Sequence, residues 1–178
     1  MTTSDCMMII AVILGPIIAV QLQKFIERWR EVNGRKLAIF KALMATRATP
    51  VSPEHVQALN MIDLEFYGNK PSDKAVTEAW KNYLDHLNNG PKDVDSPTFQ
   101  SRFDAWSAKT NDYLAELLYA MAQDLGFRFD KVQLKRGAYH PQGHADIEQE
   151  QACLRRGLVD IVLGRRTLPI SVTQDRGT

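Results

Sequence analysis

Apolar and polar positions divide the chain into one continuous apolar run near its start and several shorter, periodic segments after it. The run extends from Cys6 to Val20, fifteen residues without a charged or polar side chain. Two glutamines and a leucine extend it to Gln23, and Lys24 then begins a basic stretch. A charged side chain at the centre of a membrane helix costs about 2.5–3.5 kcal/mol, so a charge-free run that ends in bases favours a helix in a bilayer.

Three interpretations of this run are open. A cleaved signal peptide requires a basic stretch before the run and a small-residue cleavage site after it. Residues 1–5 hold neither Lys nor Arg, and Ala19-Val20-Gln21 is a poor site. A buried core helix fits the short length and the Gly15-Pro16 pair. A single-pass anchor also fits, because membrane helices tolerate Gly and Pro where neighbours satisfy the backbone. We expect the anchor, over residues 1–23.

The charges that flank the run predict its orientation. Residues 24–47 carry seven bases and two acids, whereas residues 1–5 carry Asp5 alone. Because cytoplasmic flanks are rich in Lys and Arg, we expect the N-terminus outside and the rest of the chain in the cytoplasm, with the anchor in a bacterial inner membrane. Anionic headgroups would attract this juxtamembrane basic segment. Its bases include Lys24, Arg28, Arg30, Arg35 and Lys36.

Beyond the anchor, apolar residues recur every three or four positions, which is the spacing of helices. A first helix is expected to continue straight to Thr46, with Asn33-Gly34 as the weak point at which a bend could occur. Ser52, Ser72 and Ser96, each followed by Pro or Asp, are typical helix starts. Further helices are therefore expected over residues 53–67, 72–88, 97–125 and 146–163.

Strand patterns are nearly absent, and only Val132 and Leu134 suggest a short extended piece. The sequence therefore predicts an all-α fold, in which an N-terminal transmembrane helix continues into a cytoplasmic helical bundle. We expect three parts: the anchor over residues 1–23, a basic juxtamembrane helix over 24–47 and a helical domain over 48–178. Residues 48–178 carry fifteen bases and eighteen acids, which is weak evidence against a surface that follows nucleic-acid phosphates.

Motifs for catalysis or cofactor binding are scarce. The chain has no Gly-rich phosphate loop, no H-E-x-x-H and no nucleophile elbow. We therefore expect no cofactor. Cys6 and Cys153 are too far apart in sequence to suggest a metal site or a disulfide framework. His140 and His144 are four residues apart, but the intervening Pro and Gly disfavour the helix that would align two imidazoles on a metal.

Arg136 and His140 are the weak catalytic candidates, together with His144. The pair is similar to the R-x4–6-H signature of HEPN ribonucleases, in which the arginine stabilises the phosphorane charge and the histidine moves protons. Only three residues separate Arg136 from His140, and seven separate Arg47 from His55. A structural loop is the simpler interpretation; it favours a protein that is not an enzyme and leaves the ribonuclease open.

Six blocks spread over most of the chain form a wider pattern. They are G-P-I-I-A-V at 15–20, L-A-I-F-K-A-L-M-A-T-R-A-T at 37–49, S-P-E-H-V-Q-A-L-N-M-I-D-L-E-F-Y at 52–67, A-W-K-N-Y-L-D-H-L at 79–87, Y-H-P-Q-G-H at 139–144 and R-R-G-L-V-D-I-V-L-G at 155–164. In these blocks the chain resembles a family of small single-pass bacterial proteins of unknown function. That family brings no activity to transfer.

In size and layout the chain distantly resembles the membrane accessory protein of type VI-B CRISPR–Cas loci. That protein has one N-terminal anchor and a helical cytoplasmic domain with a divergent HEPN-like motif, and it assembles into a membrane ring that supports antiviral defence. The resemblance implies a HEPN-like bundle and a homo-oligomer that acts as a pore or membrane effector, with a cytoplasmic defence protein as a further partner. A membrane-tethered ribonuclease and a non-catalytic membrane adaptor are the alternatives.

The anchor itself carries residues suited to contacts between copies. Membrane helices associate through close packing at small residues and through polar contacts. Gly15 offers a notch, Pro16 leaves a backbone carbonyl without its usual donor, and Gln21 and Gln23 can hydrogen-bond to neighbouring helices. The expected partners are therefore the lipid bilayer and further copies of the chain, while nucleic acid stays open.

Overall fold

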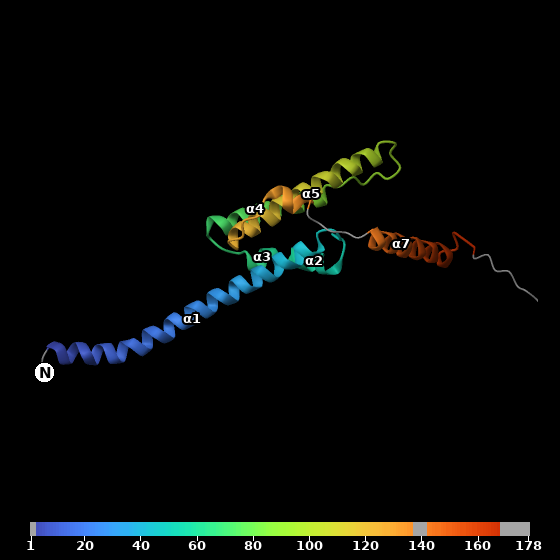
Figure 1. Ribbon diagram of the computed structural model, residues 1–178. Coiled ribbons are helices and arrows are strands. Elements are labelled where there is room, and N and C mark those ends of the chain that lie inside the picture. The colour runs from blue at the N-terminus through green and yellow to red at the C-terminus, as the bar shows by residue number, and fades with distance from the viewer. Residues whose placement is uncertain (1–2, 137–141, 168–178) are drawn as a thin grey trace, which may run out of the picture. The chain divides into compact units, whose positions relative to one another are not determined.

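The structure, a computed structural model, describes residues 3–136 and 142–167, with side chains described for 14–135, 146–147 and 149–167. The helices are α1 (Thr3–Thr46), α2 (Pro53–Asn60), α3 (Ile62–Glu65), α4 (Pro71–Asn88), α5 (Phe99–Asp124), α6 (Lys131–Arg136) and α7 (Gln142–Val162) (Figure 1). No strand occurs in these ranges. The all-α prediction is confirmed. The chain forms two compact units, Met1–Ala138 and Tyr139–Thr178.

Helix α1 has two parts with different surroundings. It is 44 residues long, which corresponds to about 66 Å at 1.5 Å per residue. Between residues 14 and 32 every described side chain is exposed, and this part extends away from α2–α5 (Figure 1). From Lys36 onward α1 enters the bundle, where Phe40 and Leu43 are buried. The helix continues through Asn33-Gly34 without interruption, at the point where the sequence suggested a bend.

The exposed part of α1 is unusually apolar for a surface helix. Its large apolar side chains are all between 40 and 68 % exposed. They are Leu14, Ile17, Ile18, Val20, Leu22, Phe25, Ile26, Trp29 and Val32. The described part of the chain contains no helix whose length and apolar character would suffice to span a membrane. Residues 6–13, which form more than half of the apolar run, lie outside the residues whose side chains are described.

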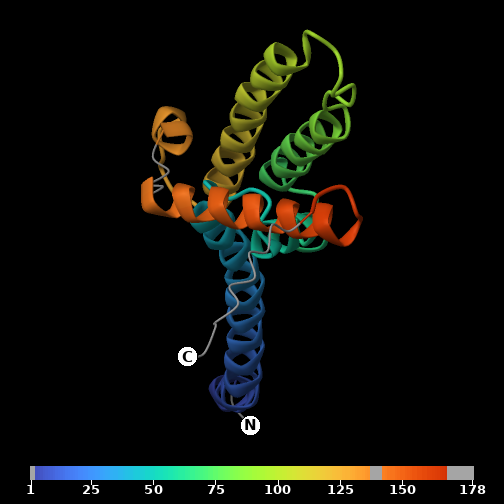
Figure 2. The ribbon, with the colours of Figure 1, turned by 90° about the vertical axis from the view of Figure 1, so that its right-hand side faces the viewer.

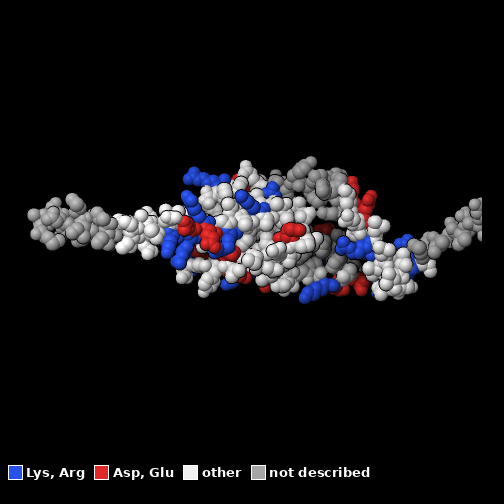
Figure 3. Space-filling model, turned by 90° about the horizontal axis from the view of Figure 1, so that it is seen from below, with Lys and Arg blue, Asp and Glu red and all other residues white. Residues whose placement is uncertain are grey.

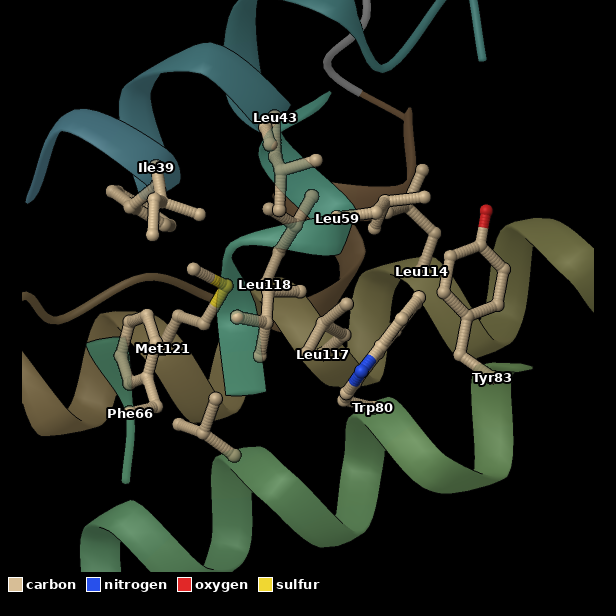
Figure 4. Close-up of a cluster of buried hydrophobic side chains, with 14 of the residues drawn as sticks. Ile39, Leu43, Leu59, Phe66, Trp80, Tyr83, Leu114, Leu117, Leu118 and Met121 are labelled. Carbon is tan, nitrogen blue, oxygen red and sulfur yellow. The ribbon is translucent and has the colours of Figure 1, made fainter. Parts of the chain in front are cut away.

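The core of the first unit lies between the second part of α1 and the α4–α5 hairpin. Helices α4 and α5 lie side by side in both ribbon views (Figure 1, Figure 2) and make the most extensive contact between any two helices described. Helix α1 packs against α2, α3 and α5. Figure 4 shows how side chains from these helices meet. Those drawn include Ile39, Leu43, Leu59, Phe66, Trp80, Tyr83, Leu114, Leu117, Leu118 and Met121.

Two helix boundaries follow the predicted signals. Ser52 caps α2, because its side-chain oxygen accepts a hydrogen bond from the His55 backbone N–H at 3.3 Å, and Pro53 takes the first helical position. Gly126 adopts a φ of 80° and follows Leu125, the C-cap residue of α5. This left-handed conformation disfavours residues with a Cβ, so glycine ends the helix there.

Other boundaries differ from the prediction. Helix α5 begins at Phe99 rather than at the Ser96-Pro97 signal. Ser96 instead opens a turn, in which its carbonyl oxygen accepts a hydrogen bond from the Phe99 N–H at 2.9 Å. Helix α4 begins at Pro71, one residue before Ser72. The extended piece expected at Val132 is wrong: α6 forms there, and the Asp130 carboxylate accepts from the Val132 N–H at 3.0 Å.

Helix α7 belongs to the second unit and is described by itself. It starts at Gln142, four residues before the expected start, and ends before Gly164, which has a φ of 71°. The apolar side chains of Leu154 and Leu158 are exposed, and so is Cys153.

Candidate functional site

A buried lysine joins three helices of the first unit. The Lys36 ammonium on α1 donates to Asp73 Oδ1 at 2.5 Å and to Asp124 Oδ2 at 2.8 Å. All three side chains are at most 8 % exposed. The ammonium also lies 4.9 Å from the centre of the Phe66 ring, within the range of a cation–π contact. We call Lys36, Asp73 and Asp124 the Lys36 cluster.

The local sequence explains how the two carboxylates reach this lysine. Asp73 stands in the first turn of α4, where the helix dipole favours an acid. Gly68 leaves room for it, since a Cβ at position 68 would lie 2.0 Å from Asp73 Oδ2. Asp124 is the last residue of α5, where the dipole disfavours an acid. Hydrogen bonds from Lys36 and Ser72 compensate for this position.

Lys36 and Asp124 are held in their charged forms. Burial by itself lowers the pKa of Lys36, but hydrogen bonds to Asp124 and Asp73 outweigh it, so that the pKa lies above its ordinary value. Burial likewise raises the pKa of Asp124, but hydrogen bonds from Lys36 and Ser72 outweigh burial and lower the pKa. A buried cation with two acids is therefore maintained by mutual pairing.

A cavity of about 420 Å³ lies beside this cluster, at the point where α1 leaves the bundle. We call it the α1 pocket. Its walls combine aromatic side chains with charges of both signs. They are Phe25, Arg28, Trp29, Val32, Asn33, Lys36, Glu65, Tyr67, Lys70 and Asp73. Figure 3 shows Lys and Arg beside Asp and Glu on the surface where α1 meets the bundle.

Charges around the α1 pocket are unevenly paired. Arg35 donates to Glu65 at 2.8 Å and to Glu31 at 2.8 Å, which ties α1 to α3. Among the residues that the structure describes, no carboxylate forms an ion pair with Arg28 or Lys70. Arg28 and Lys70 are therefore the two cations of the pocket without a direct carboxylate partner, although the charge of Lys70 also acts on Asp124 and lowers its pKa.

His55 is the histidine of the two candidate Arg–His pairs whose side chain is described, and its surroundings do not resemble a catalytic site. His55 is fully buried, and its Nδ1 lies 2.9 Å from Thr46 Oγ1. The Thr46 hydroxyl donates to the Ala42 carbonyl at 2.7 Å, so His55 Nδ1 is the donor in their contact. Burial lowers the pKa of His55. Arg47 lines a separate cavity of about 340 Å³ whose described walls do not include His55.

Other predicted site residues fall in two groups. The catalytic candidates Arg136, His140 and His144 lie outside the residues whose side chains are described. The proposed contact residues Gly15, Pro16, Gln21 and Gln23 all lie on the exposed part of α1. Gln23 donates to Glu27 on the same helix at 2.9 Å. No group of three or more metal-binding side chains is found in the described ranges.

The sequence grouped Lys36 with the other juxtamembrane bases and missed its burial. One signal was present: Lys36 precedes Ile39, Phe40 and Leu43 by three, four and seven positions, and so lies on the stripe that faces the core. A lysine at such a position requires a buried acid. Its partners are 37 and 88 residues away in the chain, and no local pattern points to them.

Together, the fold and the α1 pocket define a small helical-bundle protein with a projecting, apolar N-terminal helix. The chain belongs to a family of unknown function, DUF6680, whose model matches residues 1–178. The expected membership in a family of unknown function is thus confirmed. No curated protein and no solved structure matches the chain.

Proposed function

We propose that the protein is a non-catalytic, membrane-anchored assembly protein that forms homo-oligomers through the first part of α1. The observation that carries this proposal is the belt of large apolar side chains exposed on α1 between Leu14 and Val32. Large apolar side chains exposed on a helix in this number are normally covered by a protein core or a bilayer. Neighbouring residues are about 100° apart around a helix, so Ile17, Ile18 and Val20 spread over about 160° of its circumference, more than the roughly 100° stripe typical of a surface helix.

The charge pattern supports the same arrangement. The apolar run is followed by the bases of residues 24–47, which favours a cytoplasmic location for the bundle and an outer location for the N-terminus. The distant resemblance to the CRISPR accessory protein suggests a membrane effector or pore in antiviral defence as the form of this function. The adaptor alternative shares the anchor but needs no symmetric assembly.

A membrane-tethered ribonuclease is the less favoured candidate. Of the histidines in the two candidate Arg–His pairs, His140 and His55, only His55 has a described side chain. It is buried and hydrogen-bonded to Thr46. A general acid or base needs its own nitrogen or oxygen within about 2.6–3.2 Å of the atom that gains or loses the proton, and the buried His55 ring offers RNA no such approach. Reproducible RNA cleavage by the purified protein that disappears in Arg136→Ala would promote this candidate.

Topology is tested by fusing alkaline phosphatase, which is active only outside the cytoplasm, to residue 178. We expect little phosphatase activity, and a green fluorescent protein fused at the same position should fluoresce. Strong phosphatase activity would exclude the proposed topology.

Anchoring is tested by a matched pair of substitutions. Leu14 and Val51 are both exposed, at 46 and 90 %, so neither Leu14→Arg nor Val51→Arg should unfold the bundle. Inside a bilayer an arginine costs about 2.5–3.5 kcal/mol. We therefore expect Leu14→Arg to increase release of the protein from membranes by carbonate, while Val51→Arg behaves as the wild type. Complete release of the wild type by carbonate would contradict the anchor.

A further inference from the structure

We propose that the α1 pocket binds the phosphate of an anionic phospholipid headgroup. The inference rests on the proposed membrane anchoring and adds a ligand to it. It starts from the two cations in the pocket wall, Arg28 on α1 and Lys70 at the N-terminus of α4. Both side chains are exposed and, among the described residues, neither forms an ion pair.

The remaining charges of the pocket are already neutralised. Glu65 is paired with Arg35, and Asp73 is paired with Lys36. The five charged residues in the pocket wall are three cations and two carboxylates, which leaves one net positive charge. Lys36 also pairs with Asp124, and Arg35 also pairs with Glu31, so Arg28 and Lys70 are the cations of the pocket without a direct carboxylate partner among the described residues. A phosphodiester carries one negative charge and can accept hydrogen bonds from both exposed cations.

The depth of Arg28 agrees with a headgroup ligand. Arg28 follows Gln23, the last uncharged residue of the anchor, by five positions. Five residues of helix rise about 7.5 Å. The polar region on each side of a bilayer is about 5–7.5 Å thick, since the core measures about 30 Å and the whole bilayer about 40–45 Å. If the hydrocarbon core ends near Gln23, the Arg28 side chain lies at the level of the phosphates.

Aromatic side chains at the same level support this placement. Phe25, Trp29 and Tyr67 line the pocket and are 68, 57 and 90 % exposed. Tryptophan and tyrosine are enriched where membranes meet water, because their rings are apolar while their N–H and O–H groups remain hydrated. A lipid seated between these rings would place its phosphate near the two cations and its chains along the apolar face of α1.

The test uses the fluorescence of Trp29 in the full-length protein held in a neutral detergent. Short-chain phosphatidylglycerol is titrated in, with short-chain phosphatidylcholine and inorganic phosphate in separate arms. We expect a saturable response to phosphatidylglycerol that is absent from Trp29→Phe, because Trp80 and Trp106 lie in the bundle. The double variant Arg28→Gln/Lys70→Gln should lose at least about tenfold in apparent affinity.

A charge-matched control separates a site from general attraction. Arg30→Gln/Lys74→Gln removes the same two charges from the same two helices, but neither residue lines the pocket. Arg30 also lies about 160° from Arg28 around α1, almost on the opposite side of the helix. Wild-type affinity in this control supports the site, whereas an equal loss in both double variants overturns it. An equal response to phosphatidylcholine, or saturation by inorganic phosphate at the same concentration, overturns the assignment to an anionic lipid.

This test and that of the anchor give separable results. Arg28→Gln/Lys70→Gln leaves residues 1–23 intact, so its retention in carbonate-washed membranes should match that of the wild type. If carbonate releases the wild type completely but its Trp29 fluorescence still responds specifically to phosphatidylglycerol, the anchor is refuted and the lipid site is retained. If the wild type stays in carbonate-washed membranes but shows no specific fluorescence response to phosphatidylglycerol, the lipid site is refuted and the anchor is retained. If the double variant misfolds by circular dichroism, Arg28→Gln alone is compared with Arg30→Gln in the same titration.

Discussion

Lys36 is the buried cation that neutralises two buried carboxylates of the bundle. It holds two carboxylates from α4 and α5 at one buried point. Removing one partner of a buried charge group costs about 3–5 kcal/mol, because the other charges are left unpaired. We therefore expect Lys36→Met to lower the free energy of unfolding by about that amount. Lys41→Met, on the exposed side of the same helix, should change it by about 0.5 kcal/mol or less. Thermal unfolding followed by tryptophan fluorescence measures both.

The Lys36 cluster also predicts how stability depends on pH. The pKa of Asp124 is lowered on folding, so its contribution is present above the ordinary value of 3.8 and is lost as pH falls below it. The pKa of Lys36 is raised, so its contribution is present below 10.5 and is lost as pH rises beyond it. The difference in stability between the wild type and Lys36→Met should narrow at both extremes. A difference that stays constant across the acid range would contradict the ion pairing.

His55 adds a dependence near neutral pH. Burial lowers its pKa, so below the ordinary value of 6.5 the unfolded chain takes up a proton that the folded protein does not. Stability should therefore fall as the pH drops from 6.5 towards the lowered pKa. His55→Gln should lose this slope, even if the variant is less stable throughout. Unfolding midpoints measured between pH 5 and 8 test it, and an unchanged slope in His55→Gln would point to another group.

At the scale of elements, two glycines with opposite surroundings offer a paired test. A Cβ at Gly68, between α3 and α4, would lie 2.0 Å from Asp73 Oδ2, whereas a Cβ at Gly34 in α1 meets no atom within 4 Å. Gly68→Ala has to displace the carboxylate that pairs with Lys36, and we expect a loss of at least about 1 kcal/mol. Gly34→Ala should stabilise by about 0.5–1 kcal/mol, because glycine inside a helix costs conformational entropy. Unfolding midpoints of both variants measure the effect. If Gly68→Ala and Gly34→Ala shift the midpoint by the same amount in the same direction, the close contact at Gly68 is contradicted.

Local signals account for part of the element pattern. Ser52-Pro53 and Gly126 act through their own backbone and side chains, and the sequence predicted both correctly. Helix α6 escaped prediction because alternating Val132 and Leu134 fit a strand equally well; what the sequence did not reveal is that Leu134 packs into the core. The Lys36 cluster escaped for a related reason, since its three members come from distant parts of the chain.

At the scale of the whole molecule, the boundary between two environments falls within one helix. The same α1 that carries Phe40 and Leu43 into the core carries exposed apolar side chains before residue 33. Sequence patterns predicted a continuous helix here, and the structure confirms it. The lipid and oligomeric surroundings of the first part stay predictions, because a single chain contains neither bilayer nor neighbours.

The assembly prediction uses two glycines of α1 as a matched pair. Neither Gly15 nor Gly34 has another atom within 4 Å of an added Cβ, so a leucine at either position fits the isolated chain. Helices in a bilayer gain little from the hydrophobic effect when they associate, and they depend on close approach at small residues. If copies pack at the Gly15 notch, Gly15→Leu should shift the detergent-solubilised particle to a smaller size, measured by light scattering. Gly34→Leu, outside the anchor, should leave the size unchanged.

The same variants separate a pore from an adaptor. If the oligomer conducts ions, overexpression of the wild type should depolarise cells, and Gly15→Leu should weaken this effect in step with the loss of assembly. Membrane potential reported by a voltage-sensitive dye measures it, with Gly34→Leu as the control. A wild-type protein that remains monomeric in mild detergent and leaves the potential unchanged would exclude the pore. The anchor of α1 and the lipid site beside Lys36 would then serve an adaptor, because both act within a single copy of the chain.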